Sequence, residues 1–185
     1  MAEVKDNIFL KGVSGKFGDQ FVFKQRNGKT FICRKPQLPA QRTPNQKKHA
    51  MRFADATAYS VEARQDPELQ AYYAHLGKRK GKTAHNMAVA DYFAMPTIEQ
   101  VDTSHYTGAA GETIIIDAYK ATKVAKVTVS LRDAEGILIE QGEATEALRG
   151  WHYTTTVSNP QPSGTLLTVR AIDLPGNIAE QEIIL

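Results

Sequence analysis

The sequence has little of several features that would identify a function. It contains one cysteine, Cys33, among 185 residues, so no internal disulfide can form. No apolar run approaches the ~20 residues that a membrane-spanning helix needs. Residues 1–6 carry charges and no apolar segment, which predicts that there is no conventional signal peptide. We therefore expect synthesis in the cytoplasm, with non-conventional export or cell lysis as routes to the outside.

Motifs for catalysis or cofactor binding are also missing. Residues 77–83, GKRKGKT, have three residues before Gly-Lys-Thr, whereas a phosphate-binding loop has four and follows a strand. Cys33 lies in a strand-like run, which favours a packed thiol over a nucleophile. The five histidines lack zinc-site spacing, so only a metal site assembled from distant segments stays open. We expect a protein that is not an enzyme, with no catalytic, cofactor-binding or metal-binding residues.

The net charge of +3 hides an asymmetry along the chain. Residues 1–50 hold eleven Lys and Arg against three Asp and Glu, a net charge of +8. Residues 51–100 are balanced, and residues 101–185 hold six against eleven, a net charge of −5. The basic end could attract the acidic end of another copy, or it could meet nucleic acid. Solvated charge on a β-ribbon is the simpler alternative.

Residues 7–36 predict β-structure. Asn27-Gly28 separates two β-rich runs, residues 21–26 and 29–34, and this dipeptide favours a type I′ hairpin turn. That turn pairs Phe23 with Ile32 and Val22 with Cys33. By alternation, Phe21, Phe23 and Ile32 share one face, and Val22, Phe31 and Cys33 share the other. A ribbon with two partly apolar faces needs cover from its own chain or from another copy.

The middle of the chain predicts helices after a linker at residues 36–43. Thr43-Pro44 starts the first helix, with Gln46 completing a capping box. Asp66-Pro67 starts a second, which Gly77 is expected to end. Thr83 caps a third, which runs up to Pro96. In the first helix, residues at helical spacing form an apolar side: Ala50, Phe53, Ala54, Thr57, Ala58 and Val61.

From residue 113 the apolar residues recur with a period of two. We predict strands at residues 113–119, 124–132, 137–141, 151–157, 165–173 and 178–185. Short strands at this spacing are typical of a β-sandwich, and Trp151 is expected in its core. The predicted fold is α+β, mainly β: an N-terminal β-ribbon arm and linker (1–43), a central short-helix bundle (44–96) and a C-terminal immunoglobulin-like (Ig-like) β-sandwich (97–185).

Two resemblances accompany this pattern. Residues 170–177, RAIDLPGN, resemble the penultimate-strand motif of bacterial Ig-like modules, in which the Asp and Asn shape a turn. Over most of its length the chain also resembles a family of uncharacterised bacterial proteins. The matching stretches are residues 15–20 (GKFGDQ), 42–46 (RTPNQ), 86–92 (NMAVADY) and the C-terminal sandwich. The resemblance implies an architecture and no established activity.

These observations favour a structural subunit that self-assembles through its N-terminal arm into a homo-oligomer, filament, tube or phage-like particle. Open strand edges and oppositely charged ends suit contacts between copies. The expected contact residues are Phe21, Phe23, Arg26, Lys29, Phe31, Ile32, Arg34, Lys35, Glu140, Glu143 and Glu146. The main alternative is a nucleic-acid-binding accessory protein that uses the basic N-terminal third. A carbohydrate- or surface-binding module is supported by fold analogy alone.

Overall fold

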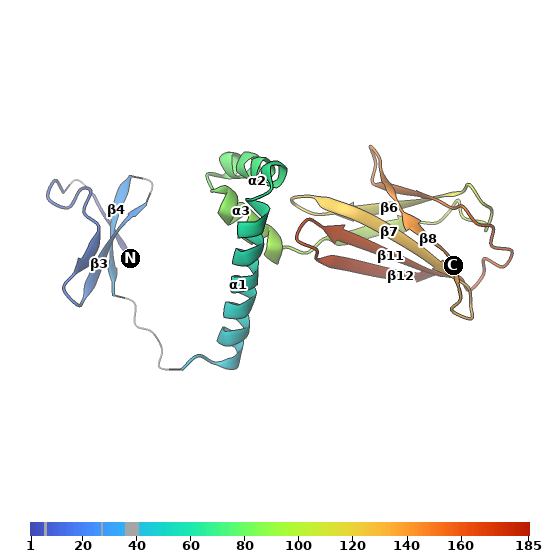
Figure 1. Cartoon of the computed structure of the whole chain (residues 1–185), viewed down its shortest axis with the longest axis horizontal. Coiled ribbons are helices and arrows are strands. Elements are labelled where there is room, and N and C mark those ends of the chain that lie inside the picture. The colour runs from blue at the N-terminus through green and yellow to red at the C-terminus, as the bar shows by residue number, and fades with distance from the viewer. Residues whose placement is uncertain (6, 27, 36–40) are drawn as a thin grey trace. The chain divides into compact units, whose positions relative to one another are not determined.

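The computed structural model describes residues 1–5, 7–26, 28–35 and 41–185. These residues form two compact units, Met1–Lys48 and His49–Leu185. Strands dominate both, and the second unit adds helices, so the fold is α+β and rich in strand, as predicted. Figure 1 shows the elements in chain order. No helix among the described residues is long and apolar enough to cross a membrane.

The N-terminal unit contains one antiparallel sheet of short strands. Its order is β1-β4-β3-β2, with β1 at Ala2–Val4, β2 at Gly15–Phe17, β3 at Phe21–Arg26 and β4 at Lys29–Arg34. The predicted register is confirmed, since Phe23 pairs with Ile32 and Val22 with Cys33. Asn27 lies outside the described residues. Gly28 has a φ of 74°, the left-handed conformation that the predicted turn requires.

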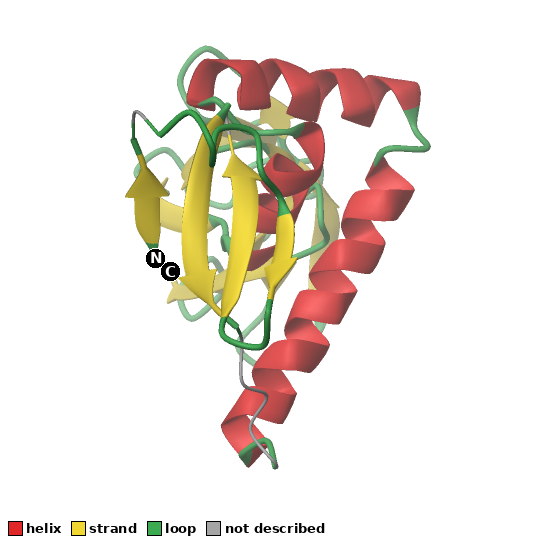
Figure 2. Cartoon of the chain, turned by 90° about the vertical axis from the view of Figure 1, so that its left-hand side faces the viewer, coloured by secondary structure: helices red, strands yellow, loops and turns green. Residues whose placement is uncertain are grey.

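Three helices follow within the described residues: α1 (Pro44–Ala63), α2 (Pro67–Lys80) and α3 (Ala84–Phe93). The predicted capping box is present, because Gln46 N–H donates to Thr43 Oγ1 at 3.3 Å and Thr43 N–H donates to Gln46 Oε1 at 3.0 Å. α1 is longer than a short-helix bundle implies and continues without a break (Figure 2). α2 then turns sharply away from it.

Two details of these helices differ from the sequence prediction. Gly77 does not end α2, which continues to Lys80 and is capped by Gly81 with a φ of 61°. Gly77 is instead needed for close approach, because a Cβ there would lie 2.4 Å from the backbone oxygen of Lys82. The apolar side predicted for α1 is also not the buried one.

α1 buries three small residues, Ala56, Ser60 and Ala63. Phe53 is 52% exposed and Val61 44% exposed, although both belong to the predicted apolar side. The buried face was missed because small and polar residues carry no strong hydrophobic signal. Its contacts with the other helices are largely aromatic and polar, including an edge-to-face pair between Tyr59 and Tyr73.

The C-terminal part of the second unit contains two antiparallel sheets. The first has the order β5-β6-β10-β9 and the second β12-β11-β7-β8. Their bounds are β5 Thr97–Asp102, β6 Thr113–Tyr119, β7 Val124–Arg132, β8 Leu138–Glu143, β9 Thr145–Glu146, β10 Trp151–Thr154, β11 Leu166–Asp173 and β12 Ile178–Ile184. The strand predictions are confirmed within a few residues, although β5 and β9 were not predicted.

One hydrophobic core joins these two sheets. It contains Ile114 and Trp151 from the first sheet and Val129 and Leu167 from the second. Trp151 is 8% exposed, which confirms its predicted place in the core. The alternating residues of β7 and β11 are buried together, so their predicted inward faces are also confirmed. We refer to residues 97–185 as the two-sheet module.

Candidate functional site

The N-terminal sheet divides the predicted contact residues between its two faces. Cross-strand partners point to the same side of a sheet, and Phe17 pairs with Phe21. One side, the aromatic face, therefore carries Phe17, Phe21, Phe23 and Ile32. The other side, the basic face, carries Lys16, Lys24, Arg26 and Lys29 around Val22, Phe31 and Cys33. The predicted assignment of Phe21, Phe23 and Ile32 to one face and of Val22, Phe31 and Cys33 to the other is confirmed. The pairing of β2 adds Phe17 to the first face and Lys16 to the second.

The aromatic face is only partly covered within its unit. Phe23 is 6% exposed and lies under the ring of Phe17, which meets it edge to face with centroids 6.1 Å apart. Phe17 itself is 68% exposed and Phe21 is 41% exposed. Phe23 thus serves as the small core of the sheet, and Phe17 and Phe21 are the side chains available for contact.

Some of the predicted charged contact residues are engaged inside the chain. Lys29 Nζ lies 3.1 Å from Glu3 Oε1, and Lys35 Nζ lies 2.8 Å from Asp19 Oδ1. Both lysines remain partly exposed, so these pairs are weak and exchangeable. Arg26 and Arg34 are exposed and form no ion pair within the described residues.

Among the predicted acidic contacts, Glu140 must be corrected. It is 7% exposed, and its Oε2 accepts hydrogen bonds from Thr156 N–H at 2.8 Å and from Val157 N–H at 3.3 Å. Its carboxylate therefore shapes the two-sheet module and cannot meet an outside cation. Glu143 is paired with Lys126, and Glu146 is exposed.

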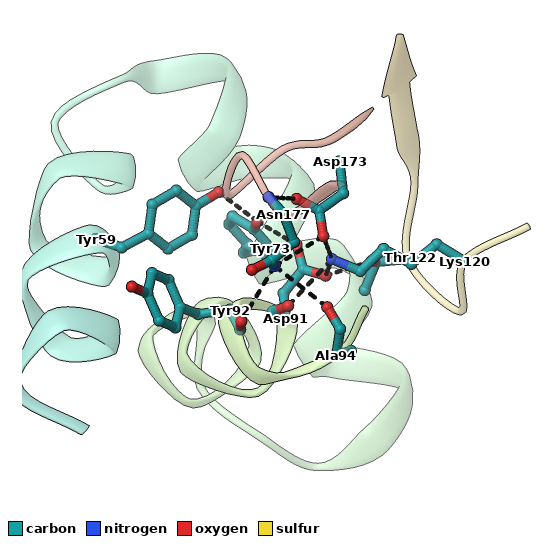
Figure 3. Close-up of polar contacts among 9 residues, drawn as sticks. All are labelled: Tyr59, Tyr73, Asp91, Tyr92, Ala94, Lys120, Thr122, Asp173 and Asn177. Atoms are coloured by element: carbon teal, nitrogen blue, oxygen red, sulfur yellow. Dashed lines mark hydrogen bonds and ion pairs between the residues drawn. The ribbon is translucent and has the colours of Figure 1, made fainter. Parts of the chain in front are cut away.

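A buried ion cluster that the sequence did not predict lies between the helices and the two-sheet module. The side chains of Lys120, Asp91 and Asp173 are each 0% exposed (Figure 3). Lys120 Nζ is 2.7 Å from Asp91 Oδ1, donates to the Asp91 backbone oxygen at 3.0 Å and forms an ion pair with Asp173. The three donors of the ammonium group are all used.

Neutral donors stabilise both carboxylates of the cluster. Tyr73 Oη donates to Asp91 Oδ2 at 2.6 Å, and Thr122 donates to the same carboxylate. Asn177 donates to Asp173 twice, from its backbone N–H at 2.6 Å and from Nδ2 at 2.9 Å. Two buried carboxylates facing one cation would be costly without these hydrogen bonds.

The cluster joins elements that are distant in the sequence. Asp91 comes from α3, Lys120 from the β6–β7 connection and Asp173 from the end of β11. Asn177 Nδ2 also reaches the backbone oxygens of Tyr92 at 3.1 Å and Ala94 at 3.3 Å, at the end of α3. This arrangement fixes α3 against one end of the two-sheet module.

The tyrosines beside the cluster are held in the neutral form. Burial raises the pKa of Tyr73, and its hydrogen bond to Asp91 raises it further. Burial likewise raises the pKa of Tyr59, whose hydroxyl lies 2.8 Å from that of Tyr73. A neutral Tyr73 retains the hydroxyl proton that it donates to Asp91 Oδ2.

Only faint signals of this cluster exist in the sequence. Asp91 is the single carboxylate of α3, whose other residues are mostly apolar or small. Asp173 and Asn177 belong to the turn motif to which we gave a structural role. Lys120 carries no pattern at all. Because every charged member is sealed from solvent, the arrangement suits a rigid joint and gives a substrate no access.

The remaining candidates for chemistry have ordinary surroundings. Cys33 is half-buried on the basic face. His85 Nδ1 lies 2.6 Å from Ser60 Oγ, where it helps to join α1 to α3. No group of three or more metal-ligating side chains gathers anywhere in the described ranges.

Comparison with known proteins gives little more. No family model matches the sequence, and no curated protein matches it. One similar solved structure is that of CopC from Methylosinus trichosporium OB3b, with 16% identity and a TM-score of 0.35. The match covers 48% of this chain and 87% of that chain. A structural match with this TM-score supports no conclusion about the fold or the function of this chain.

Proposed function

We propose that this chain is a non-enzymatic structural subunit that self-assembles through its N-terminal sheet into a filament, tube or phage-like particle. The observation that carries the proposal is the aromatic face, which the N-terminal unit itself leaves partly uncovered. Within the N-terminal unit, Phe23 is the only buried apolar side chain among the described residues. Phe17 and Phe21 are exposed beside it.

A single-layer sheet of this size is not expected to be stable alone. A sheet buries its apolar face against a second layer, and short sheets without one are marginal in water. Covering Phe17 and Phe21 would add about 1.5–3 kcal/mol for each side chain fully buried. Contact with another copy would supply the missing layer and would order the sheet as part of assembly.

The faces of the sheet are better suited to this contact than its edges. Both edge strands, β1 and β2, have three residues, and short edges limit strand addition. Charge favours a head-to-tail contact, because the N-terminal region is basic and residues 101–185 are acidic. Arg34, which pairs with Phe21 and lies on the aromatic face, is the exposed cation for this contact. Arg26 lies on the basic face. Glu146 is the exposed carboxylate, and Glu140 is excluded by its burial.

The two-sheet module is proposed to be Ig-like. Its sheet β5-β6-β10-β9 corresponds to the A-B-E-D sheet of an Ig constant-type domain. Its sheet β12-β11-β7-β8 corresponds to G-F-C with an added C′ strand. All eight strands take these places in chain order, which supports the resemblance to bacterial Ig-like modules. Membership of the uncharacterised bacterial family remains part of the same proposal.

The proposal is tested by light scattering behind size-exclusion chromatography. The double variant Phe17→Asp, Phe21→Asp places charge on the aromatic face and leaves Phe23 in the core of the sheet. We expect it to be monomeric under conditions in which the wild type assembles. Leu148→Asp is the matched control, since Leu148 is fully exposed in the other unit, and it should assemble normally. Assembly of the double variant at the wild-type level would refute the proposed contact.

The basic face favours a second function, nucleic-acid binding. Lys16, Lys24 and Arg26 lie on the same side of the sheet as the half-buried ring of Phe31. Cations and an aromatic ring on one face can bind phosphates and stack bases. Affinity for single-stranded DNA would then fall steeply with salt, and Lys16→Glu, Lys24→Glu would abolish it. Binding that is unaffected by this double variant would exclude the basic face.

A further inference from the structure

Lys120 is a buried amine that contacts two buried carboxylates. The side chains of Lys120, Asp91 and Asp173 are all 0% exposed. Lys120 Nζ lies 2.7 Å from Asp91 Oδ1 and forms an ion pair with Asp173 Oδ2 (Figure 3). An amine held against a carboxyl group in an interior without water has both partners that an amide bond needs. Fixed contact between two reacting groups can replace a large part of the entropic cost of bringing them together.

Burial favours the amide over the ion pair. In water, an ammonium and a carboxylate are strongly solvated, and this solvation opposes their condensation. In the cluster both groups have left water, where charges are costly unless they are fully paired. Conversion of Lys120 and one carboxylate to a neutral amide removes two of the three buried charges. The carboxylate that remains keeps its own hydrogen bonds.

The hydrogen-bond partners of Asp91 suit it to carry a proton. Its side chain accepts from the hydroxyl groups of Tyr73 and Thr122. A hydroxyl group can accept a hydrogen bond as well as donate one, so Asp91 keeps these partners when it is protonated. Tyr73 Oη has an alternative acceptor for its own proton, because the Tyr59 hydroxyl lies 2.8 Å away.

The partners of Asp173 suit it to be attacked. In the described part of the chain, every donor to its side chain is an N–H group. The backbone N–H of Asn177 donates to Oδ1 at 2.6 Å, and Asn177 Nδ2 donates to Oδ2 at 2.9 Å. A fixed backbone N–H stabilises the negative charge that develops on a carboxyl oxygen during attack, as in an oxyanion hole.

We propose that Lys120 and Asp173 condense to an isopeptide bond inside the folded chain. Asp91 takes a proton from the ammonium group, and the neutral amine attacks Cγ of Asp173. The bond between Nζ and Cγ forms, and the bond between Cγ and Oδ2 breaks. Of the three ammonium protons, two leave with Oδ2 as water and one stays on the amide nitrogen. Asp91 carries the departing protons and ends ionised, so the step needs no other reactant.

The bond joins the connection between β6 and β7 to the end of β11. It closes a covalent loop at the end of the two-sheet module against which α3 packs, and the ion cluster is the state of the chain before it forms. The reaction takes place within one chain and involves no residue of the N-terminal sheet. It therefore goes beyond the proposed function, and either proposal can fail without the other.

The test is mass spectrometry of the purified full chain after incubation at neutral pH. We expect most of the wild type to be lighter than the unlinked sequence by one water molecule. Trypsin does not cleave after an amide-bonded lysine, so residues 83–123 should stay in one peptide, with residues 171–185 attached as a branch. Lys126 and Glu143 form an exposed ion pair and are the matched control; no peptide should join them. The full unlinked mass would overturn the proposal and leave the ion cluster as the final state.

The same digest identifies which carboxylate reacts. A bond to Asp91 would lie inside the peptide of residues 83–123, which would itself lack one water molecule, and residues 171–185 would be released unlinked. That result would overturn the assignment of Asp173 as the group attacked.

Asp91→Asn tests the proton transfer. The substitution keeps the shape of the side chain and the ion pair between Lys120 and Asp173, and the emission of the buried Trp151 reports whether the module is folded. The folded variant should keep the full unlinked mass. Loss of water to the wild-type extent would refute the role of Asp91. If the variant does not fold, the mass of the wild type still decides whether the bond exists.

Discussion

Replacing Lys120 by methionine tests the buried ion cluster directly. The substitution keeps most of the side-chain volume and removes the only cation between Asp91 and Asp173. Because both carboxylates are fully buried, they would face each other without a counter-ion. Breaking one partner out of a buried ion pair typically costs 3–5 kcal/mol. For a unit of about 140 residues this corresponds to a loss of roughly 10–15 °C in Tm.

The same module offers a matched control. Lys126 pairs with Glu143, with side chains that are 42% and 66% exposed, and exposed pairs contribute about 0–1 kcal/mol. Lys126→Met should therefore change the free energy of unfolding by less than about 1 kcal/mol. Both substitutions remove one lysine, so differences in net charge cancel in the comparison.

Urea unfolding followed by fluorescence is the assay for both variants. Trp151 is the only tryptophan and is 8% exposed in the module core, so its emission reports unfolding of that module. A difference of at least 2 kcal/mol between the two variants is expected. Equal costs would show that the cluster contributes no more than a surface pair, and the account of a rigid joint would fail.

Three further predictions concern stability. Gly77→Ala should destabilise the helices by roughly 1–3 kcal/mol, because the new Cβ would lie 2.4 Å from the backbone oxygen of Lys82. Urea unfolding followed by far-UV circular dichroism, which reports helix content, is the assay. Wild-type stability of the variant would contradict this prediction. The pKa of Glu112 is lowered, chiefly by its hydrogen bond from Thr107. The stabilisation that Glu112 contributes to the folded state is therefore present above pH 4.5 and is lost as the pH falls. Glu112→Gln should make the free energy of unfolding less dependent on pH on the acid side, and an unchanged pH dependence would contradict this prediction. Burial and the charge of Glu140 raise the pKa of Tyr153 from 10.0 to about 12, so the free energy of unfolding should fall as the pH rises from 10 towards 12. The fall should be less steep in Tyr153→Phe. Equal slopes in the wild type and the variant would contradict this prediction.

Sequence patterns within single strands and turns made much of the fold predictable. Alternation defined β7 and most of β11 because Val127, Val129 and Leu131 in β7 and Leu167, Val169 and Ala171 in β11 are apolar and buried. Asn27-Gly28 defined the hairpin register. The two strands that were missed in the two-sheet module lack this signal. β5 is mostly polar on its outer side, and β9 has two residues. The role of Gly77 was ambiguous, since a helix end and a close backbone contact both favour a residue without a side chain.

The candidate sites were less predictable because they depend on distant segments. Asp91 and Lys120 meet only when α3 packs on the module, and neither carries a motif. The pairing of β2 adds Phe17 to the aromatic face and Lys16 to the basic face, and no sequence pattern indicated that pairing. In α1, the buried face could not be recognised because alanine and serine occupy it. The unused apolar side was visible in the sequence, but its exposure was not.

Electron microscopy of the purified wild-type chain beside the Phe17→Asp, Phe21→Asp variant tests the central claim most directly. We expect ordered filaments, tubes or particles from the wild type and dispersed single molecules from the variant. Dispersed molecules from both proteins, across concentrations and salt conditions, would contradict self-assembly through the N-terminal sheet.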